Sequence, residues 1–148
     1  MTLPYLSSGY NCAMIVRNVS LFILYTPEGK ILLQHRSKDA ERLPNYWGFF
    51  GGGIEQGESP EQALKREVVE ELSYDVRNPY FLTTQKYILD ETEGTKYVFV
   101  EKYDNDPLEL GEGQAMEWFY PDEIEKLQMS DYDRSLVQQI KTYLDGKR

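Results

Sequence analysis

The residues best suited to chemistry are three glutamates in an acidic segment that follows a run of glycines, which we expect to form a turn. If this segment is helical, Glu67, Glu70 and Glu71 fall within an arc of roughly 100°. Carboxylates so close together repel one another, which favours a bound cation, and hard divalent ions take oxygen ligands. Such an ion is best used to neutralise a phosphate-rich substrate. The competing interpretation is an ordinary solvated helix face.

The local sequence predicts a helix from Pro60 to Leu72 that would carry these acids. Ser59 suits the N-cap position, proline suits the first helical position, and Gln62 completes a Ser-x-x-Gln capping box. Arg66 lies beside the acids and could hold one carboxylate in a bidentate pair. A separate apolar stripe is expected to pack against a core, and its members are Leu64, Val68 and Leu72.

The joint spacing is more specific than the acids alone. Gly52 is followed by five residues and Glu58, then by seven residues and the run from Arg66 to Glu71. This pattern resembles the Nudix box of the Nudix hydrolase family, Gly-x5-Glu-x7-Arg-Glu-U-x-Glu-Glu-x-Gly-U, where U is bulky and apolar. The chain departs from the box after Glu71, with Ser73 in place of glycine and a tyrosine at the last apolar position. We expect this change to alter the helix exit rather than the chemistry.

The resemblance implies a metal site. Family members hold Mg²⁺, with Mn²⁺ as a substitute, and the matching ligands here are Glu67, Glu70, Glu71 and the carbonyl oxygen of Gly52. The MutT-type branch of the family carries a Glu-Gly-Gln stretch after the box, and this chain has Glu112-Gly113-Gln114. The resemblance therefore adds Glu112 as a metal ligand. By itself, Glu112 would be interpreted as a surface acid.

The resemblance also assigns catalytic roles. A carboxylate should take the proton of the attacking water, and the base varies among family members, so Glu67 is nominated first and Glu71 second. Arg66 should orient Glu67. The backbone at Gly51 and Gly53 can approach phosphate closely because neither residue has a Cβ atom.

Two residues outside the box are candidates for substrate binding. Arg36 matches an arginine that reaches the bound nucleotide in the MutT-type branch, and a guanidinium suits phosphate. The competing interpretation is a solvated arginine at a strand end. Asp133 stands near a polar residue that hydrogen-bonds the base in that branch. Its competing interpretation is helix capping.

The function that follows is hydrolysis of a pyrophosphate bond in a nucleoside diphosphate linked to another group. The Glu112-Gly113-Gln114 similarity favours nucleoside triphosphates, including those of oxidised purines, with release of a monophosphate and pyrophosphate. Nucleoside diphosphate sugars and ADP-ribose remain competing substrates. A non-catalytic nucleotide-sensing module is the alternative of another class.

The sequence as a whole predicts an α/β protein. The hydrophobic pattern predicts strands and helices in an order that implies a mixed sheet with helices on both sides, and the resemblance implies a Nudix-type α/β/α sandwich with a central mixed β-sheet. The expected strands span Asn11–Tyr25, Ile31–Arg36, Tyr46–Phe50, Phe81–Leu89, Lys96–Tyr103 and Met116–Tyr120, and later helices span Pro121–Leu127 and Tyr132–Leu144.

Length and composition limit the possible partners. The 148 residues are expected to form one domain, from residue 1 to 148. A formal charge of −9 argues against long nucleic acids, so we expect a small nucleotide that arrives with its metal ions. No apolar run is long enough to span a membrane. Cys12 is alone, which fits the cytoplasm. A homodimer, common in the family, is left open.

Overall fold

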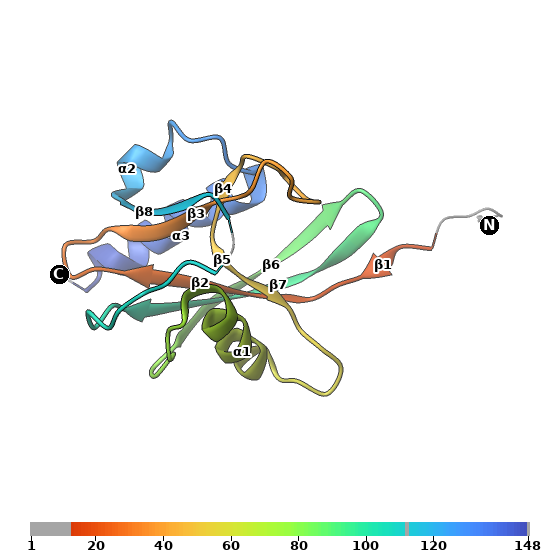
Figure 1. The fold of residues 1–148 in the computed structure, drawn as a ribbon, viewed down its shortest axis with the longest axis horizontal. Coiled ribbons are helices and arrows are strands. Elements are labelled where there is room, and N and C mark those ends of the chain that lie inside the picture. The colour runs from red at the N-terminus through yellow and green to blue at the C-terminus, as the bar shows by residue number, and fades with distance from the viewer. Residues whose placement is uncertain (1–12, 112, 148) are drawn as a thin grey trace.

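The computed structural model describes residues 13–111 and 113–147, and this part of the chain forms one large sheet with three helices (Figure 1). The strands are β1 (Ile15–Val16), β2 (Val19–Tyr25), β3 (Ile31–His35), β4 (Trp47–Gly48), β5 (Phe50–Gly53), β6 (Tyr80–Leu89), β7 (Thr92–Lys102) and β8 (Ala115–Phe119). The helices are α1 (Pro60–Leu72), α2 (Pro121–Ile124) and α3 (Asp131–Asp145). No helix among the described residues has the length and apolar character needed to cross a membrane.

The sheet is mixed, as predicted. Strand β7 runs parallel to β1 and β2 and antiparallel to β6, while β3 pairs antiparallel with β4 and β8. Strands β2 and β3 meet only at their hairpin, where Tyr25 pairs with Ile31, because β5 takes the place beside β2 from Val19 to Phe22. The two halves of the sheet therefore separate next to β5, and the candidate site lies there.

The helices cover both faces of the sheet, which confirms the predicted α/β/α sandwich (Figure 1). Alternate residues of β2 point to opposite faces. Phe22 and Leu24 pack with the apolar stripe of α1, and Ile23 packs with Leu136 and Ile140 of α3. The predicted stripe of α1 is fully buried: Leu64, Val68 and Leu72 each have 0% exposure.

Helix α1 begins where its capping residues predict. The Ser59 hydroxyl accepts a hydrogen bond from the Gln62 N–H at 3.1 Å, and the Gln62 side chain accepts one from the Ser59 N–H at 2.8 Å. At the other end Ser73 adopts the left-handed conformation, with φ 53° and ψ 34°. This conformation explains why a glycine suits the position, since glycine alone adopts it without steric cost.

The tyrosine at the last apolar position of the box is buried with a polar partner. Tyr74 is 1% exposed, and its hydroxyl donates to the Glu101 carboxylate at 2.9 Å. The same carboxylate accepts from the N–H groups of Arg77 and Asn78 at 3.1 and 2.7 Å. Burial, together with the bond to Glu101, raises the pKa of Tyr74. The position therefore keeps its place in the core and also satisfies a buried carboxylate.

Several predicted boundaries were wrong. The expected glycine turn is part of strand β5, which pairs with β2, and the turn comes later, at residues 56–57. The long strand predicted up to Tyr25 breaks at Arg17 and Asn18, and residues 11–12 lie outside the described part. Helix α2 ends at Ile124 instead of Leu127.

Candidate functional site

Glu67 lies in direct contact with the strand that precedes the helix. A Cβ atom added to Gly52 would come within 2.3 Å of the Glu67 Cδ atom and 2.4 Å of its Oε1 atom. Only glycine allows the carboxylate to approach the backbone of β5 so closely. The side chain of Glu67 keeps 18% exposure, so this carboxylate is held in a fixed place that solvent still reaches.

Arg66 fixes the carboxylates on either side of it. Its Nε and Nη2 atoms donate to the two oxygens of Glu58 at 2.8 and 2.9 Å, and Nη1 donates to Glu67 Oε2 at 2.7 Å. Nη2 also donates to the carbonyl oxygen of Gly53 at 3.0 Å. The bidentate partner of Arg66 is therefore Glu58, which precedes the helix, while Glu67 receives a single bond that orients it.

These bonds change the acidity of the groups involved. The hydrogen bonds from Arg66, followed by one from the Glu55 backbone N–H, lower the pKa of Glu58 to about 2. The bonds to Glu58 and Glu67 raise the pKa of the Arg66 guanidinium. Arg66 is thus a permanent cation in the middle of an acidic cluster.

The other two helix acids have different surroundings. Glu71 Oε1 accepts a hydrogen bond from the Gly51 N–H at 2.8 Å, which ties the end of α1 to β5. Gly51 has a φ of 136°, and a Cβ atom there would lie 2.0 Å from the Ser20 carbonyl oxygen. Glu70 is exposed, with its Oε1 atom 3.9 Å from Arg66 Nη1.

The carboxylates suit a hard divalent ion in kind, although they are not gathered around one point. Among residues 13–111 and 113–147, no group of three or more histidine, cysteine, aspartate or glutamate side chains is arranged to hold a metal ion. The reason is visible in the contacts: Glu67 is bound to Arg66, Glu71 to Gly51, and Glu70 faces solvent. Their oxygens, next to a backbone that a Cβ would block, are nevertheless the donors that Mg²⁺ takes.

Glu112 lies outside the described residues, but its neighbours return to the acidic end of α1. The Gly111 N–H donates to the Glu71 carbonyl oxygen at 2.8 Å. Gly113 lines a hollow together with Glu71 and Arg36. The loop on both sides of position 112 therefore lies beside the cluster.

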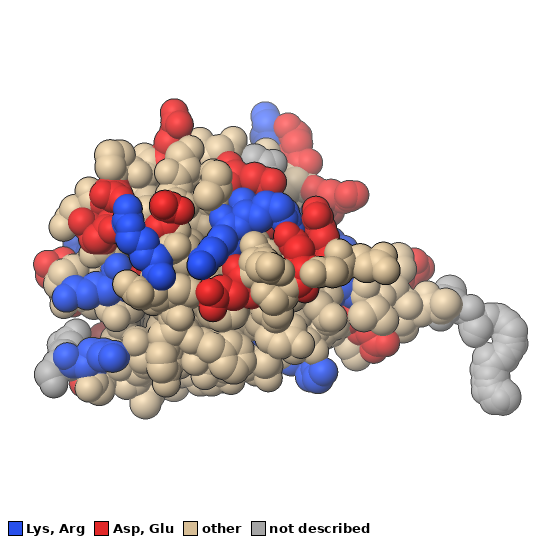
Figure 2. All heavy atoms as spheres, turned by 90° about the horizontal axis from the view of Figure 1, so that it is seen from below, with Lys and Arg blue, Asp and Glu red and all other residues tan. Residues whose placement is uncertain are grey.

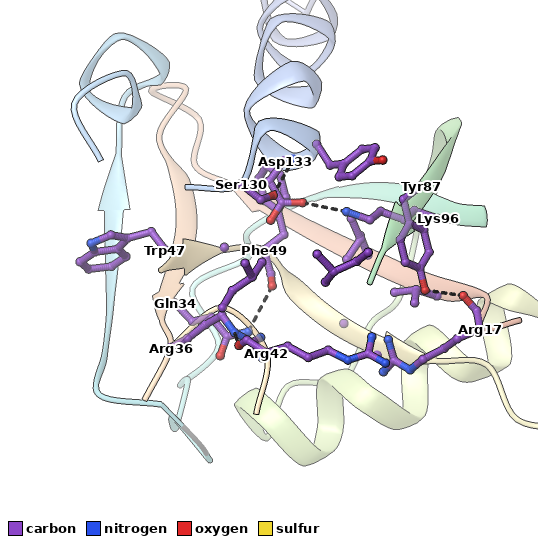
Figure 3. A pocket seen from close by; sticks show the side chains of 18 residues that line it. Arg17, Gln34, Arg36, Arg42, Trp47, Phe49, Tyr87, Lys96, Ser130 and Asp133 are labelled. Carbon is purple, nitrogen blue, oxygen red and sulfur yellow. Dashed lines mark hydrogen bonds and ion pairs between the residues drawn. The ribbon is translucent and has the colours of Figure 1, made fainter. Parts of the chain in front are cut away.

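A pocket opens beside the glycines of β5, between the separated halves of the sheet and the start of α3 (Figure 3). Gly51 and Gly52 line it, so it reaches the strand against which Glu67 is held. Much of its wall is apolar or aromatic, contributed by Leu21, Trp47, Phe49, Tyr87, Leu89 and Tyr132. Its cations are Arg17, Arg36, Arg42 and Lys96. Aromatic walls with a few polar groups are typical of small-molecule sites.

Asp133 faces this pocket from the first turn of α3. Its Oδ1 atom lies 3.3 Å from the Lys96 ammonium, and the two side chains are 13% and 14% exposed. The capping role belongs to Ser130, whose hydroxyl accepts from the Asp133 N–H at 3.1 Å. Ser130 thus caps the helix, and the carboxylate of Asp133 lines the pocket.

Arg36 also lines the pocket, immediately after β3. Its Nε atom donates to the carbonyl oxygen of Arg42 at 2.8 Å, so it also holds the loop that follows. His35, the residue before Arg36, stacks on Trp47 with ring centres 4.6 Å apart. Trp118 contacts Tyr103 on the α1 side of the sheet.

The sequence did not point to several residues of the pocket. Arg17, Gln34, Arg42 and Lys96 belong to no motif, and only the folded chain brings these distant residues together around one pocket. The single local signal was Arg17, a charged residue that interrupts a strongly β-forming run.

Residues 14–140 match the NUDIX domain family. The chain belongs to the Nudix family. It is 31% identical over 101 residues to the 8-oxo-dGTP diphosphatase of Escherichia coli (strain K12), which covers 68% of this chain and 77% of that protein. An RNA pyrophosphohydrolase of Proteus mirabilis is 35% identical over 104 residues, 69% of this chain and 53% of that protein. Two further relatives are matched over only 30% and 32% of their length.

The fold agrees with this assignment. The crystal structure of a MutT protein from Methanosarcina mazei Go1 superimposes with a TM-score of 0.80 and covers 93% of this chain and 100% of that one. The two sequences are 19% identical, so this likeness concerns the fold.

Proposed function

We propose that this chain hydrolyses a pyrophosphate bond in a nucleoside diphosphate linked to another group. For a nucleoside triphosphate the products would be a monophosphate and pyrophosphate. The proposal rests chiefly on the position of the Glu67 carboxylate. It is held against Gly52 and oriented by Arg66, at one end of a pocket lined by cationic and aromatic side chains. This arrangement offers one place for phosphates and an adjoining one for a base.

The proposed cofactor is Mg²⁺, with Mn²⁺ as a substitute. Its ligands would be Glu67, Glu70, Glu71, Glu112 and the carbonyl oxygen of Gly52. When bound, such ions neutralise phosphate charge and make a water molecule a better nucleophile. The need is plain in a chain with a formal charge of −9, which would otherwise repel a polyphosphate.

The residues of the chain have distinct proposed roles. Glu67 is the first candidate for the general base and Glu71 the second. Arg66 would keep Glu67 in place, because it donates to Glu67 Oε2 and leaves the other oxygen available to accept a proton. The backbone of Gly51 and Gly53 would lie along the phosphates.

The proposed substrate class is nucleoside triphosphates, including those of oxidised purines. The pocket has aromatic side chains to pack against a base, and Asp133 supplies an acceptor for its N–H groups. Arg36 adds a positive charge on the path to the acidic cluster. The similarity to a protein named 8-oxo-dGTP diphosphatase supports this choice over nucleoside diphosphate sugars and ADP-ribose.

The test is a panel of nucleotides assayed with Mg²⁺ or Mn²⁺, with the products resolved by chromatography. The panel includes ordinary and 8-oxo purine triphosphates, ADP-ribose, a nucleoside diphosphate sugar and an RNA with a 5′-triphosphate. We expect a nucleoside triphosphate to give monophosphate and pyrophosphate. Binding without turnover across the panel would instead identify a nucleotide sensor.

A further inference from the structure

Three half-buried arginines without a carboxylate partner line the same pocket. They are Arg17, Arg36 and Arg42. Within the described residues, the ion pairs of arginine involve only Arg66 and Arg77. In a chain with 25 acidic and 16 basic residues, most arginines should find an acid nearby. Unpaired guanidinium groups at one cavity therefore indicate an anion that comes from outside the chain.

Arg17 lies next to the acidic cluster. Its guanidinium is in contact with Gly53, where an added Cβ atom would be 3.3 Å from Nε and 3.4 Å from Nη2. The carbonyl oxygen of Gly53 is the one that receives Arg66 Nη2. Arg17 is anchored by its backbone N–H, which donates to the Glu93 carbonyl oxygen at 2.8 Å. The guanidinium therefore lies between the pocket and the site proposed for the metal ions.

Arg42 approaches from the opposite side of the pocket, on the loop between β3 and β4. Its Nη2 atom lies 3.5 Å from the Thr92 hydroxyl, at the start of β7. Its carbonyl oxygen is held by Arg36, so the loop is tied to both sides of the pocket. Figure 3 shows the side chains of Arg17 and Arg42 directed toward one another, with their guanidinium groups adjacent in that view.

We infer that Arg17 and Arg42 form a clamp that binds the nucleoside-bearing phosphate without a metal ion. A guanidinium presents paired N–H donors that match phosphate oxygens, and two of them can hold one phosphate from opposite sides. The position between the base pocket and the acidic cluster fits the phosphate attached to the nucleoside. Arg36 acts as a positioning residue, because it holds the loop of Arg42. The assignment of the phosphate to a nucleotide rests on the proposed function.

The clamp predicts metal-independent binding of a nucleoside monophosphate. The experiment is calorimetric or NMR titration of the whole chain with GMP, guanosine and inorganic phosphate in EDTA. We expect GMP to bind more tightly than guanosine, and inorganic phosphate to compete with it. Arg17→Gln and Arg42→Gln should each weaken GMP binding by roughly tenfold or more, since hydrogen bonds to charged groups are the strong ones.

Matched variants separate the clamp from charge, folding and catalysis. Arg77→Gln removes the same charge from a side chain that pairs with Asp104 and Asp106 outside the pocket, and it should bind GMP as the wild type does. Arg17→Lys and Arg42→Lys keep charge and solubility but lose the paired donors, so they should also bind GMP more weakly. Glu70→Gln should bind GMP in EDTA as tightly as the wild type, although it should lose turnover with Mg²⁺. Loss of GMP binding therefore tests the clamp, and loss of turnover tests the proposed function.

Three results would overturn the clamp. One is equal affinity for GMP and guanosine in EDTA, or no GMP binding at all. Another is unchanged GMP affinity in the variants of Arg17 and Arg42. The third is an equal loss in Arg77→Gln, which would show that overall charge alone attracts the nucleotide.

Discussion

Among single residues, the close approach of the Glu67 carboxylate to the backbone of β5 is decisive for the proposed chemistry. Glu67 occupies the space that a side chain at Gly52 would fill. It is also bound by Arg66, which in turn is held by Glu58 and by the Gly53 carbonyl oxygen. The position of Glu67 is therefore determined directly by Gly52 and Arg66 and indirectly by Glu58, and each of these three residues can be substituted separately.

Gly52→Ala should displace Glu67 without unfolding the chain. The new Cβ atom would come within 2.3 Å of the Glu67 carboxylate carbon, so the carboxylate must move. A displacement of about 1 Å at a reacting centre costs roughly a hundredfold in rate. Steady-state kinetics would measure this loss, with Gly146→Ala as the control, because its added Cβ meets only ordinary contacts. Normal turnover by Gly52→Ala would show that catalysis does not depend on the position of Glu67 against Gly52.

Arg66→Lys should lower kcat more than it raises KM. A lysine cannot hold Glu58 with two parallel donors and also reach Glu67 and the Gly53 carbonyl oxygen. Losing a residue that orients a ligand costs roughly 10- to 100-fold in activity. The measurement is kcat and KM at saturating Mg²⁺. A change confined to KM would show that Arg66 contacts the substrate instead of orienting Glu67.

Glu58 should make the stability of the chain depend on acid. Its pKa falls from the usual 4.5 to about 2 in the folded state, chiefly through the bonds from Arg66. A depressed pKa stabilises the fold above pH 4.5, and this stabilisation is lost as the pH falls through 2. Melting temperatures of the wild type and Glu58→Gln should therefore differ at pH 7 and converge near pH 2. Parallel curves would show that Glu58 contributes no such linkage.

Among the helices and strands, the sequence predicts those whose ends are set by neighbouring residues. It does not predict those that depend on pairing with a distant strand. Helix α1 was placed correctly because Ser59, Pro60 and Gln62 define its start within four residues. The glycines were mistaken for a turn because their strand pairs with β2, about thirty residues earlier in the chain. The spacing of Glu58, Arg66 and Glu67 is visible in the sequence. That Glu58 is the bidentate partner of Arg66 depends on the fold of the chain between residues 58 and 66, which the sequence does not show.

The exit of α1 offers a test of stability at this scale. Ser73 adopts a left-handed conformation, which costs a non-glycine residue roughly 1 kcal/mol. Ser73→Gly should therefore raise the free energy of unfolding by about 0.5–1 kcal/mol in urea titrations. Ser73→Ala keeps the strained backbone and should give no gain. If both variants were less stable than the wild type, the serine would have a role that its conformation does not explain.

At the scale of the whole molecule, the pocket is cationic although the chain is acidic. On the face drawn in Figure 2, basic and acidic side chains lie side by side and the basic ones form no continuous band. This one face therefore offers a long nucleic acid no continuous basic track. The pocket collects residues from β2, β3, β7 and α3, so Arg17 and Lys96 could not be recognised before these elements were assembled.

We propose that the acids of α1 act in hydrolysis of a pyrophosphate bond. The most direct test is the turnover number of Glu70→Gln with Mg²⁺, on the nucleotide that the wild type hydrolyses best. Glu70 is exposed, so the substitution should leave the fold intact. We expect the turnover number to fall by roughly three orders of magnitude, since a bound metal supplies several kcal/mol to the transition state. Turnover equal to that of the wild type would contradict it.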